Sequence, residues 1–109
     1  MIYDLKNESA EVIPHFKGGD GSFIAKIHSD GVNKIIHGTL PPQSTIGRHT
    51  HEEDSEIIFI LSGHGSVLDD NELLPLEAGQ CHYCPQSHSH SLINDSTEEL
   101  VFFAVVPKA

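Results

Sequence analysis

The hydrophobic residues of this chain fall in short segments between turn signals, and no segment shows a helical repeat long enough for a buried helix. The segments are rich in Val, Ile and Phe, which favour strands, and Gly, Pro and Asp residues separate them. About eight or nine strands at this spacing predict an all-β fold, either a sandwich or a small closed barrel. The predicted strands cover about residues 22–28, 33–40, 45–51, 56–61, 65–69, 72–76, 79–84, 89–94 and 99–106.

The chain has 109 residues, a length that corresponds to about one domain with a core of its own. We therefore expect a single domain over residues 1–109, in which residues 1–20 form an N-terminal arm and residues 33–106 form the core of the barrel. Within the arm, residues 1–12 are the segment that could hold a short helix.

Two of the predicted strands, 56–61 and 100–106, are apolar on nearly every residue. Because successive side chains of a strand point to opposite faces, the outer face of both strands must also be covered. A homodimer that packs sheet against sheet would cover them, and this is our prediction. The alternative is that the N-terminal arm folds back across one of the two strands.

The charge of the chain limits its partners. Six Lys and Arg residues against sixteen Asp and Glu residues give a net charge of 6 − 16 = −10, which opposes binding to nucleic acid or to anionic membranes. No apolar run is long enough to span a membrane. The first residues do not resemble a secretion signal, and two cysteines are too few for a disulfide scaffold, so we expect the cytoplasm.

The two cysteines, Cys81 and Cys84, form a Cys-x-x-Cys pattern that by itself suggests zinc binding or thiol redox chemistry. On a strand, however, residues three apart face opposite ways, so packing is the preferred interpretation. Cys84 faces the same side as His82, and the pattern leaves open whether that side is the lumen.

Nine histidines are an unusual number for this length, and six of them lie between residues 49 and 90. His49 and His51 share one face of a predicted strand, about 7 Å apart at Cα, which suits chelation. Glu56 begins the next apolar strand and would be a costly buried carboxylate unless a cation compensates it. His90 lies in a later strand that could complete the set. In the alternative interpretation, His49 and His51 are exposed polar residues of an edge strand.

Two motifs surround these residues. The first reads His49-x-His51-x4-Glu56-x6-Gly63, and the second runs from Gly79 through Pro85, Ser87 and His90 to Asn94. Over about residues 33–106 the chain resembles the cupin superfamily, whose two signature motifs have this spacing. The resemblance implies a jelly-roll β-barrel, also called a double-stranded β-helix. It also implies that His49, His51, Glu56 and His90 bind one divalent transition metal, which could be Fe, Mn, Ni, Zn, Co or Cu.

The chain departs from the cupin motifs at two glycine positions, which are occupied by Gln43 and Ser87. Both are expected in turns, where only backbone freedom is at stake. The ligand set is therefore not put in doubt.

Three further residues are candidates for acid and base chemistry near the metal: His37, Tyr83 and His88. His37 could reach the rim of the pocket, Tyr83 could turn its hydroxyl to the lumen, and His88 could line the mouth. In the alternative interpretation, each of them packs or faces solvent.

The charges around the predicted site bear on its ligand. The acidic run at residues 52–54 lies between two ligands and would repel an anion, while Lys26 and Lys34 could be rim cations. Within the resemblance this disfavours oxalate decarboxylation and sugar phosphates. It leaves neutral polyols, sugars, phenolics or a small acid that ligates the metal directly.

Two functions follow from this reading. We expect a metal-dependent enzyme on a small neutral or metal-chelating metabolite, with isomerase-, dioxygenase- or decarboxylase-like chemistry. The alternative is a non-catalytic protein that binds a sugar or another small molecule as a sensor.

Overall fold

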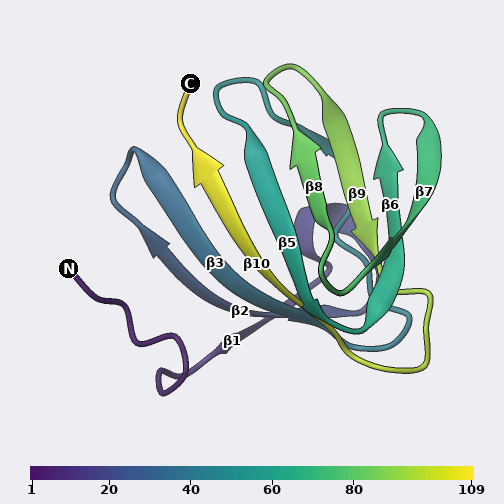
Figure 1. Cartoon of the computed structure of the whole chain (residues 1–109), viewed down its shortest axis with the longest axis horizontal. Helices are drawn as coiled ribbons and strands as arrows, with labels where there is room; N and C mark the ends of the chain where they lie inside the picture. The colour runs from purple at the N-terminus through teal and green to yellow at the C-terminus, as the bar shows by residue number, and fades with distance from the viewer.

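A computed structural model describes all residues 1–109 as two antiparallel β-sheets that face each other (Figure 1). The strands of the first sheet are, in spatial order, β1 (Glu11–Pro14), β2 (Ser22–Ser29), β3 (Asn33–Leu40), β10 (Leu100–Pro107), β5 (Glu56–Ser62) and β8 (Cys81–Cys84). Those of the second are β4 (His49–Thr50), β9 (Ser89–Ile93), β6 (His64–Asp69) and β7 (Glu72–Glu77).

This arrangement confirms the all-β, jelly-roll prediction, although the two sheets do not join into a closed barrel. The predicted strand over residues 45–51 is shorter than expected, because only His49–Thr50 pair as β4 and Thr45 forms an isolated bridge to Ile93. The arm contains a strand that the pattern did not predict, β1, followed by the short 3-10 helix η1 (Phe16–Gly18). No helix of the structure has the length and apolar character needed to cross a membrane.

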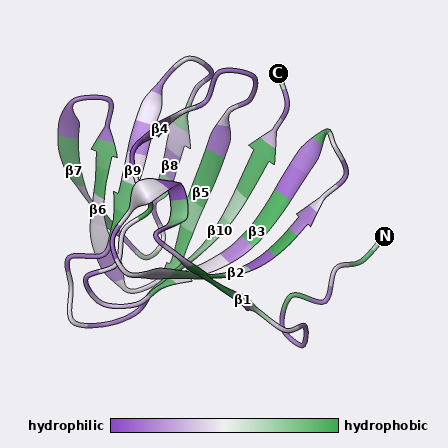
Figure 2. Ribbon diagram, turned by 180° about the vertical axis from the view of Figure 1, so that it is seen from behind, coloured by the Kyte–Doolittle hydropathy of each residue, from purple (hydrophilic) through white to green (hydrophobic).

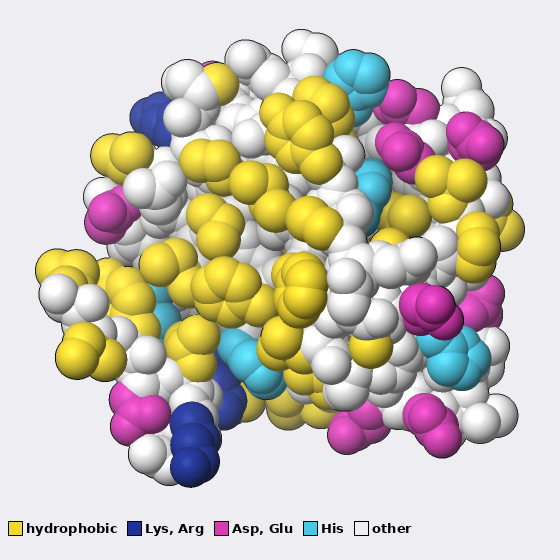
Figure 3. Space-filling view, in the orientation of Figure 1, with side chains coloured by type: hydrophobic (Ala, Val, Ile, Leu, Met, Phe, Trp, Pro, Cys, Tyr) yellow, Lys and Arg dark blue, Asp and Glu magenta, His cyan; other side chains and the backbone are white.

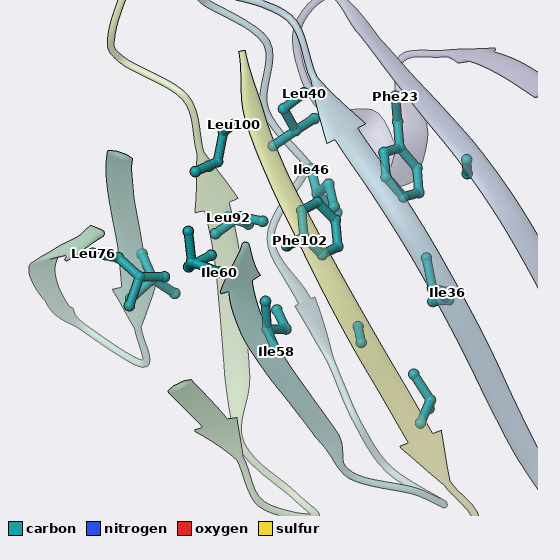
Figure 4. Close-up of a cluster of buried hydrophobic side chains, with 14 residues drawn as sticks. Phe23, Ile36, Leu40, Ile46, Ile58, Ile60, Leu76, Leu92, Leu100 and Phe102 are labelled. Carbon is teal, nitrogen blue, oxygen red and sulfur yellow. The ribbon is translucent and has the colours of Figure 1, made fainter. Parts of the chain in front are cut away.

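The core lies between the two sheets. Side chains of β10 alternate between fully buried and partly exposed positions, as expected for a strand with one face on the core. Phe102 stacks on Phe23 of β2, with ring centroids 5.7 Å apart, and Ile58 and Ile60 of β5 lie beside them (Figure 4). Hydrophobic stretches follow the same central strands in Figure 2. This core fixes the inward direction of each strand that contributes to the site.

The outer face of the first sheet is also rich in hydrophobic side chains. On β5, Ile57, Phe59 and Leu61 are 41%, 42% and 46% exposed. Hydrophobic atoms gather across the middle of this face in Figure 3, which views the molecule from the same side as Figure 1. The N-terminal arm does not cover these strands: its side-chain contacts go to β2, where Tyr3 stacks on His28 and Glu8 accepts a hydrogen bond from it.

The two positions at which the cupin motifs have glycine adopt the left-handed backbone that glycine favours. Gln43 has φ 64° and Ser87 has φ 74°. The turns of the motifs are therefore kept, with non-glycine residues in an unfavourable conformation.

Candidate metal centre

Both sheets contribute to a cluster of four side chains. His49 of β4 lies directly opposite His90 of β9 in the antiparallel register, and His51 is the residue immediately after β4. Glu56 is the first residue of β5 in the facing sheet. One potential ligand atom from each of His49, His51, Glu56 and His90 lies within 4.8 Å of all the others. The structure thus brings together the four residues that the motifs indicate.

The distances within the cluster match those between ligands of one ion. His90 Nε2 lies 2.9 Å from His51 Nε2 and 3.1 Å from His49 Nε2. Glu56 Oε1 lies 3.0 Å from His90 Nε2, 3.2 Å from His51 Nε2 and 3.9 Å from His49 Nε2. Two ligand atoms held at about 2.1 Å from an ion and at right angles to each other would be about 3.0 Å apart. The side chains are therefore already close to a chelating arrangement.

Hydrogen bonds on the far side of two rings determine which nitrogen faces the cluster. His49 Nδ1 donates to the carbonyl oxygen of Gly47 at 2.8 Å, and His51 Nδ1 donates to Asp54 Oδ1 at 2.6 Å. Both partners can only accept, so Nδ1 carries the proton in each ring. In the neutral rings, Nε2 then presents a lone pair to the cluster, as metal ligation requires.

Burial makes these lone pairs costly without a cation. His51 and Glu56 are each 7% exposed and His90 is 1% exposed. Burial by itself raises the pKa of Glu56, but the hydrogen bonds that His49, His51 and His90 donate in their protonated form outweigh it and hold this pKa well below its usual range. Glu56 likewise accepts a hydrogen bond from the protonated form of His51, which raises the pKa of His51 against the opposing effect of burial.

The chemistry of the donors fits a divalent transition metal. Three imidazole nitrogens and one carboxylate oxygen suit borderline ions, whereas structural zinc sites are usually rich in thiolates. The inward-facing lone pairs of His49 and His51 beside an ionised carboxylate are an arrangement that a divalent cation would stabilise. The cluster has the composition and geometry of a metal centre.

Two cavities adjoin the donors. The inner one holds about 20 Å³, room for roughly one water molecule, and hydrophobic side chains such as Phe23, Ile58 and Phe102 line most of it. The outer one holds about 380 Å³ and reaches His49, His51 and Glu56 from the open end of the sheets. Its other charged lining residues are Lys17, Lys34, Glu52, Glu53 and Asp54. A small molecule can therefore approach the donors from this side.

None of the three acid and base candidates lines either cavity. His37 lies between the inward-facing Ile36 and Gly38 of β3 and so faces outward, and Tyr83 of β8 is 57% exposed. His88 lies at the surface, where its Nδ1 bonds Asp70 Oδ2 at 2.6 Å. Strand alternation or a surface turn directs the side chains of all three away from the four clustered residues.

The rim cations also differ from expectation. Lys34 lines the outer cavity, but Lys26 instead donates to the carbonyl oxygen of Leu5 in the arm. Lys17 of η1 is a second cation at the cavity that the sequence did not indicate.

His82 is a neighbour of the centre that the sequence interpretation did not assign. It is 6% exposed on β8, and its Nε2 lies 3.0 Å from His90 Nδ1. Burial and the nearby His90 lower the pKa of His82, so the ring is neutral near pH 7. Cys84 is fully buried on the same face, so the side shared by His82 and Cys84 is the inner one. In the sequence, strand alternation shows that His82 and Cys84 share one face of the strand, but it does not show whether that face is buried.

The fold and the cluster together define a class: a small jelly-roll protein whose sheets carry a cluster of three histidines and one glutamate that could hold a metal ion. A family model described as the Cupin domain matches residues 36–106. The chain belongs to the cupin family, as the two motifs predicted.

Relatives of known structure or name include proteins from Thermotoga maritima. An oxalate-binding protein of this organism is 39% identical over 67 residues, which cover 62% of this chain and 55% of that protein. This chain thus matches little more than half the length of that relative. A T. maritima crystal structure described as a predicted oxalate decarboxylase superposes over the full length of both chains, with a TM-score of 0.94 and 28% identity. A putative sugar phosphate isomerase from Acidithiobacillus ferrooxidans shares the fold, with a TM-score of 0.83 and 22% identity over all of this chain and 75% of that one.

Proposed function

We propose that this protein binds one divalent transition metal through His49, His51, Glu56 and His90, and that the metal holds a small carboxylic acid able to chelate it. The convergence of the four ligand atoms at the base of an open cavity of about 380 Å³ carries the proposal. When bound, a divalent ion would supply Lewis acidity and coordination positions for an outside ligand.

The residues around the centre support a chelating acid rather than a freely approaching anion. Glu52, Glu53 and Asp54 surround the mouth with negative charge, so attraction through the cavity alone would be weak. Lys17 and Lys34 offer two cations that could pair with the outer carboxylate of a bound diacid. The name of the T. maritima relative, an oxalate-binding protein, agrees with a ligand of this kind.

A second candidate is a metal-dependent enzyme on such a metabolite, with isomerase-, dioxygenase- or decarboxylase-like chemistry. The specific observation in its favour is the mixed lining of the outer cavity, where Lys17, Lys34, Glu52 and Glu53 provide proton donors and acceptors. The interior beside the donors favours binding instead, because its lining is apolar apart from the ligands themselves.

The test of the proposed function measures metal first and ligand second. We expect elemental analysis of protein purified without an affinity step to find about one transition metal ion per chain. Isothermal titration should then show oxalate binding to the metal-loaded protein and none to protein treated with a chelator. Product analysis of the same mixture by mass spectrometry distinguishes turnover from binding.

His49→Ala removes one proposed ligand and should weaken Zn²⁺ binding by at least about tenfold. Even the loss of a residue that only hydrogen-bonds to a metal ligand lowers metal affinity by about this factor. His64→Ala is the matched control, because His64 is exposed on β6 and does not belong to the cluster. Equal metal content in wild type and His49→Ala would refute the metal site. Metal binding without oxalate binding would refute the proposed small-molecule ligand and leave the metal site intact.

We also propose that the protein is a homodimer and works in the cytoplasm. The hydrophobic outer face of the first sheet supports the dimer, because exposed apolar patches of this kind commonly mark interfaces. The free thiols of Cys81 and Cys84 agree with a reducing compartment.

A further inference from the structure

His90 differs from the other two histidine ligands in the group that holds its far side. Gly47 and Asp54 present oxygen atoms that can only accept a hydrogen bond, and they fix the proton of His49 and His51 on Nδ1. The partner of His90 is another imidazole, His82, at 3.0 Å. A neutral imidazole can donate or accept, so the tautomer of His82 decides the tautomer of His90.

The surroundings of His82 favour the accepting role. Its Nε2 is used by His90, and its Nδ1 has no hydrogen-bond partner in the protein. No fully buried side-chain nitrogen or oxygen lacks a partner, so Nδ1 must reach solvent. His82 does line a surface groove of about 460 Å³ between β6, β7 and β8, together with Val67, Leu74 and Tyr83. Water in this groove can accept the Nδ1 proton, which leaves Nε2 as the acceptor for His90.

We infer that His82 is a positioning residue for the metal centre: it accepts a hydrogen bond from His90 Nδ1 and thereby keeps His90 Nε2 free to bind the ion. The inference rests on the proposed metal site. His82 itself does not touch the ion in this role, and it acts only through the orientation and tautomer of His90.

A second ion between His82, Cys84 and His90 is the competing use of the same residues, since their ligand atoms also lie within 4.8 Å of one another. Two contacts favour the hydrogen bond. The distance between the two rings is that of a direct N–H···N bond, and the Cys84 thiol is directed to the carbonyl oxygen of His88 at 3.5 Å. Such an ion would also require His90 to bridge two metals through both nitrogens.

The experiment compares Zn²⁺ affinity, measured by competition with a chelator, in wild type, His82→Leu, His82→Gln and Cys84→Ser. Leu cannot accept a hydrogen bond, so His82→Leu should weaken Zn²⁺ binding about 10- to 100-fold. Gln offers a carbonyl oxygen to His90, and His82→Gln should recover most of this loss. Cys84→Ser is the matched control on the same face of β8 and should bind Zn²⁺ like wild type.

A second measurement needs no variant. In ¹⁵N-labelled, Zn²⁺-loaded wild type, long-range ¹H–¹⁵N spectra should place the proton of both His82 and His90 on Nδ1. A proton on His82 Nε2 would overturn the inference, whether or not the variants fold.

The other outcomes are also decisive. Wild-type affinity in both His82 variants would overturn the positioning role and leave the metal site intact. Two Zn²⁺ ions per chain, with one lost in both His82→Leu and Cys84→Ser, would overturn it in favour of a second metal site. A wild type that binds no Zn²⁺ would overturn the proposed function itself.

Discussion

The two cysteines of β8 lie three residues apart and face opposite ways. Cys81 is exposed on the outer side, whereas Cys84 is fully buried beside Glu56, its partner in the β5 register. Burial first, and then the negative charge of Glu56, raise the pKa of the Cys84 thiol to about 11. The thiol therefore stays protonated over the physiological range.

We predict that Cys84 is almost inert to iodoacetamide at pH 8, because the thiolate is the reactive form. Since its pKa is raised, the reaction should accelerate about tenfold per pH unit until the pH approaches 11. Mass spectrometry of Cys81→Ser, which retains Cys84 alone, measures this rate. The companion variant Cys84→Ser should be alkylated readily at Cys81. Equal rates for the two variants at pH 8 would contradict the prediction.

Ser87 is a residue whose backbone conformation conflicts with its side chain. At φ 74° a side chain is strained by roughly 1–2 kcal/mol, and glycine is not. The turn is held by the backbone N–H of Ser87, which donates to His51 O at 2.6 Å, and a glycine would keep this bond.

We predict that Ser87→Gly stabilises the protein by about 0.5–1 kcal/mol, after subtraction of the greater flexibility of glycine in the unfolded chain. Urea unfolding measures the change. Ser29→Gly, at the end of strand β2, is the control and should destabilise instead. A loss of stability in Ser87→Gly would mean that the positive φ of Ser87 does not destabilise the folded protein.

At the scale of the elements, β10 is a central strand of the first sheet, and its two faces differ in burial. It pairs with β3 on one side and with β5 on the other. Phe102 is 1% exposed in the core, whereas Phe103 next to it points to the outer face and is only half-buried.

We predict that Phe102→Ala lowers the free energy of unfolding by about 3–5 kcal/mol, because it leaves a cavity against Phe23. Phe103→Ala should cost less in the isolated chain, since its ring is not enclosed by the core. Chemical denaturation of both variants at equal, low protein concentration tests the difference. Equal losses would show that the core does not depend on Phe102.

The register between elements also explains why the four residues of the cluster meet. His49 and His90 are 41 residues apart but directly opposite each other in the β4–β9 pair. Glu56 approaches from the facing sheet, where it begins β5. A slip of one residue in the pairing of β4 or β5 would turn one of these side chains to the outer face.

At the scale of the whole molecule, the exposed hydrophobic face of the first sheet is the feature that the single chain leaves uncovered. Ile57, Phe59 and Leu61 on β5 belong to this face, and the N-terminal arm packs on β2 instead. The proposed homodimer would bury it.

We predict a species near 2 × 11.9 = 23.8 kDa in sedimentation at micromolar concentration. Phe59→Lys places a charge in the proposed interface and should shift the protein to a species near 11.9 kDa. Leu73→Lys is the control, because Leu73 is 62% exposed on β7 in the other sheet. A wild type that sediments as a single chain would refute the dimer.

The sequence by itself determined the strand pattern, the cupin family and the four residues that cluster between the sheets. It could do so because strand periodicity is local, and because the motifs record the spacing at which His49, His51, Glu56 and His90 can converge. It also identified Gln43 and Ser87 as turn positions, which the positive φ of both residues confirms.

Only the tertiary structure decided which face of each strand is inside and which distant side chains touch. Alternation shows that His82 and Cys84 share a side and that His37 shares one with Ile35, but both patterns are unchanged if the strand is turned over. The pairing of β8 with β5 and of β3 with β10 removes this ambiguity, since it directs His82 toward His90 and His37 away from the core. Such pairings join residues far apart in the chain, and their energy comes from the assembled core rather than from any local segment.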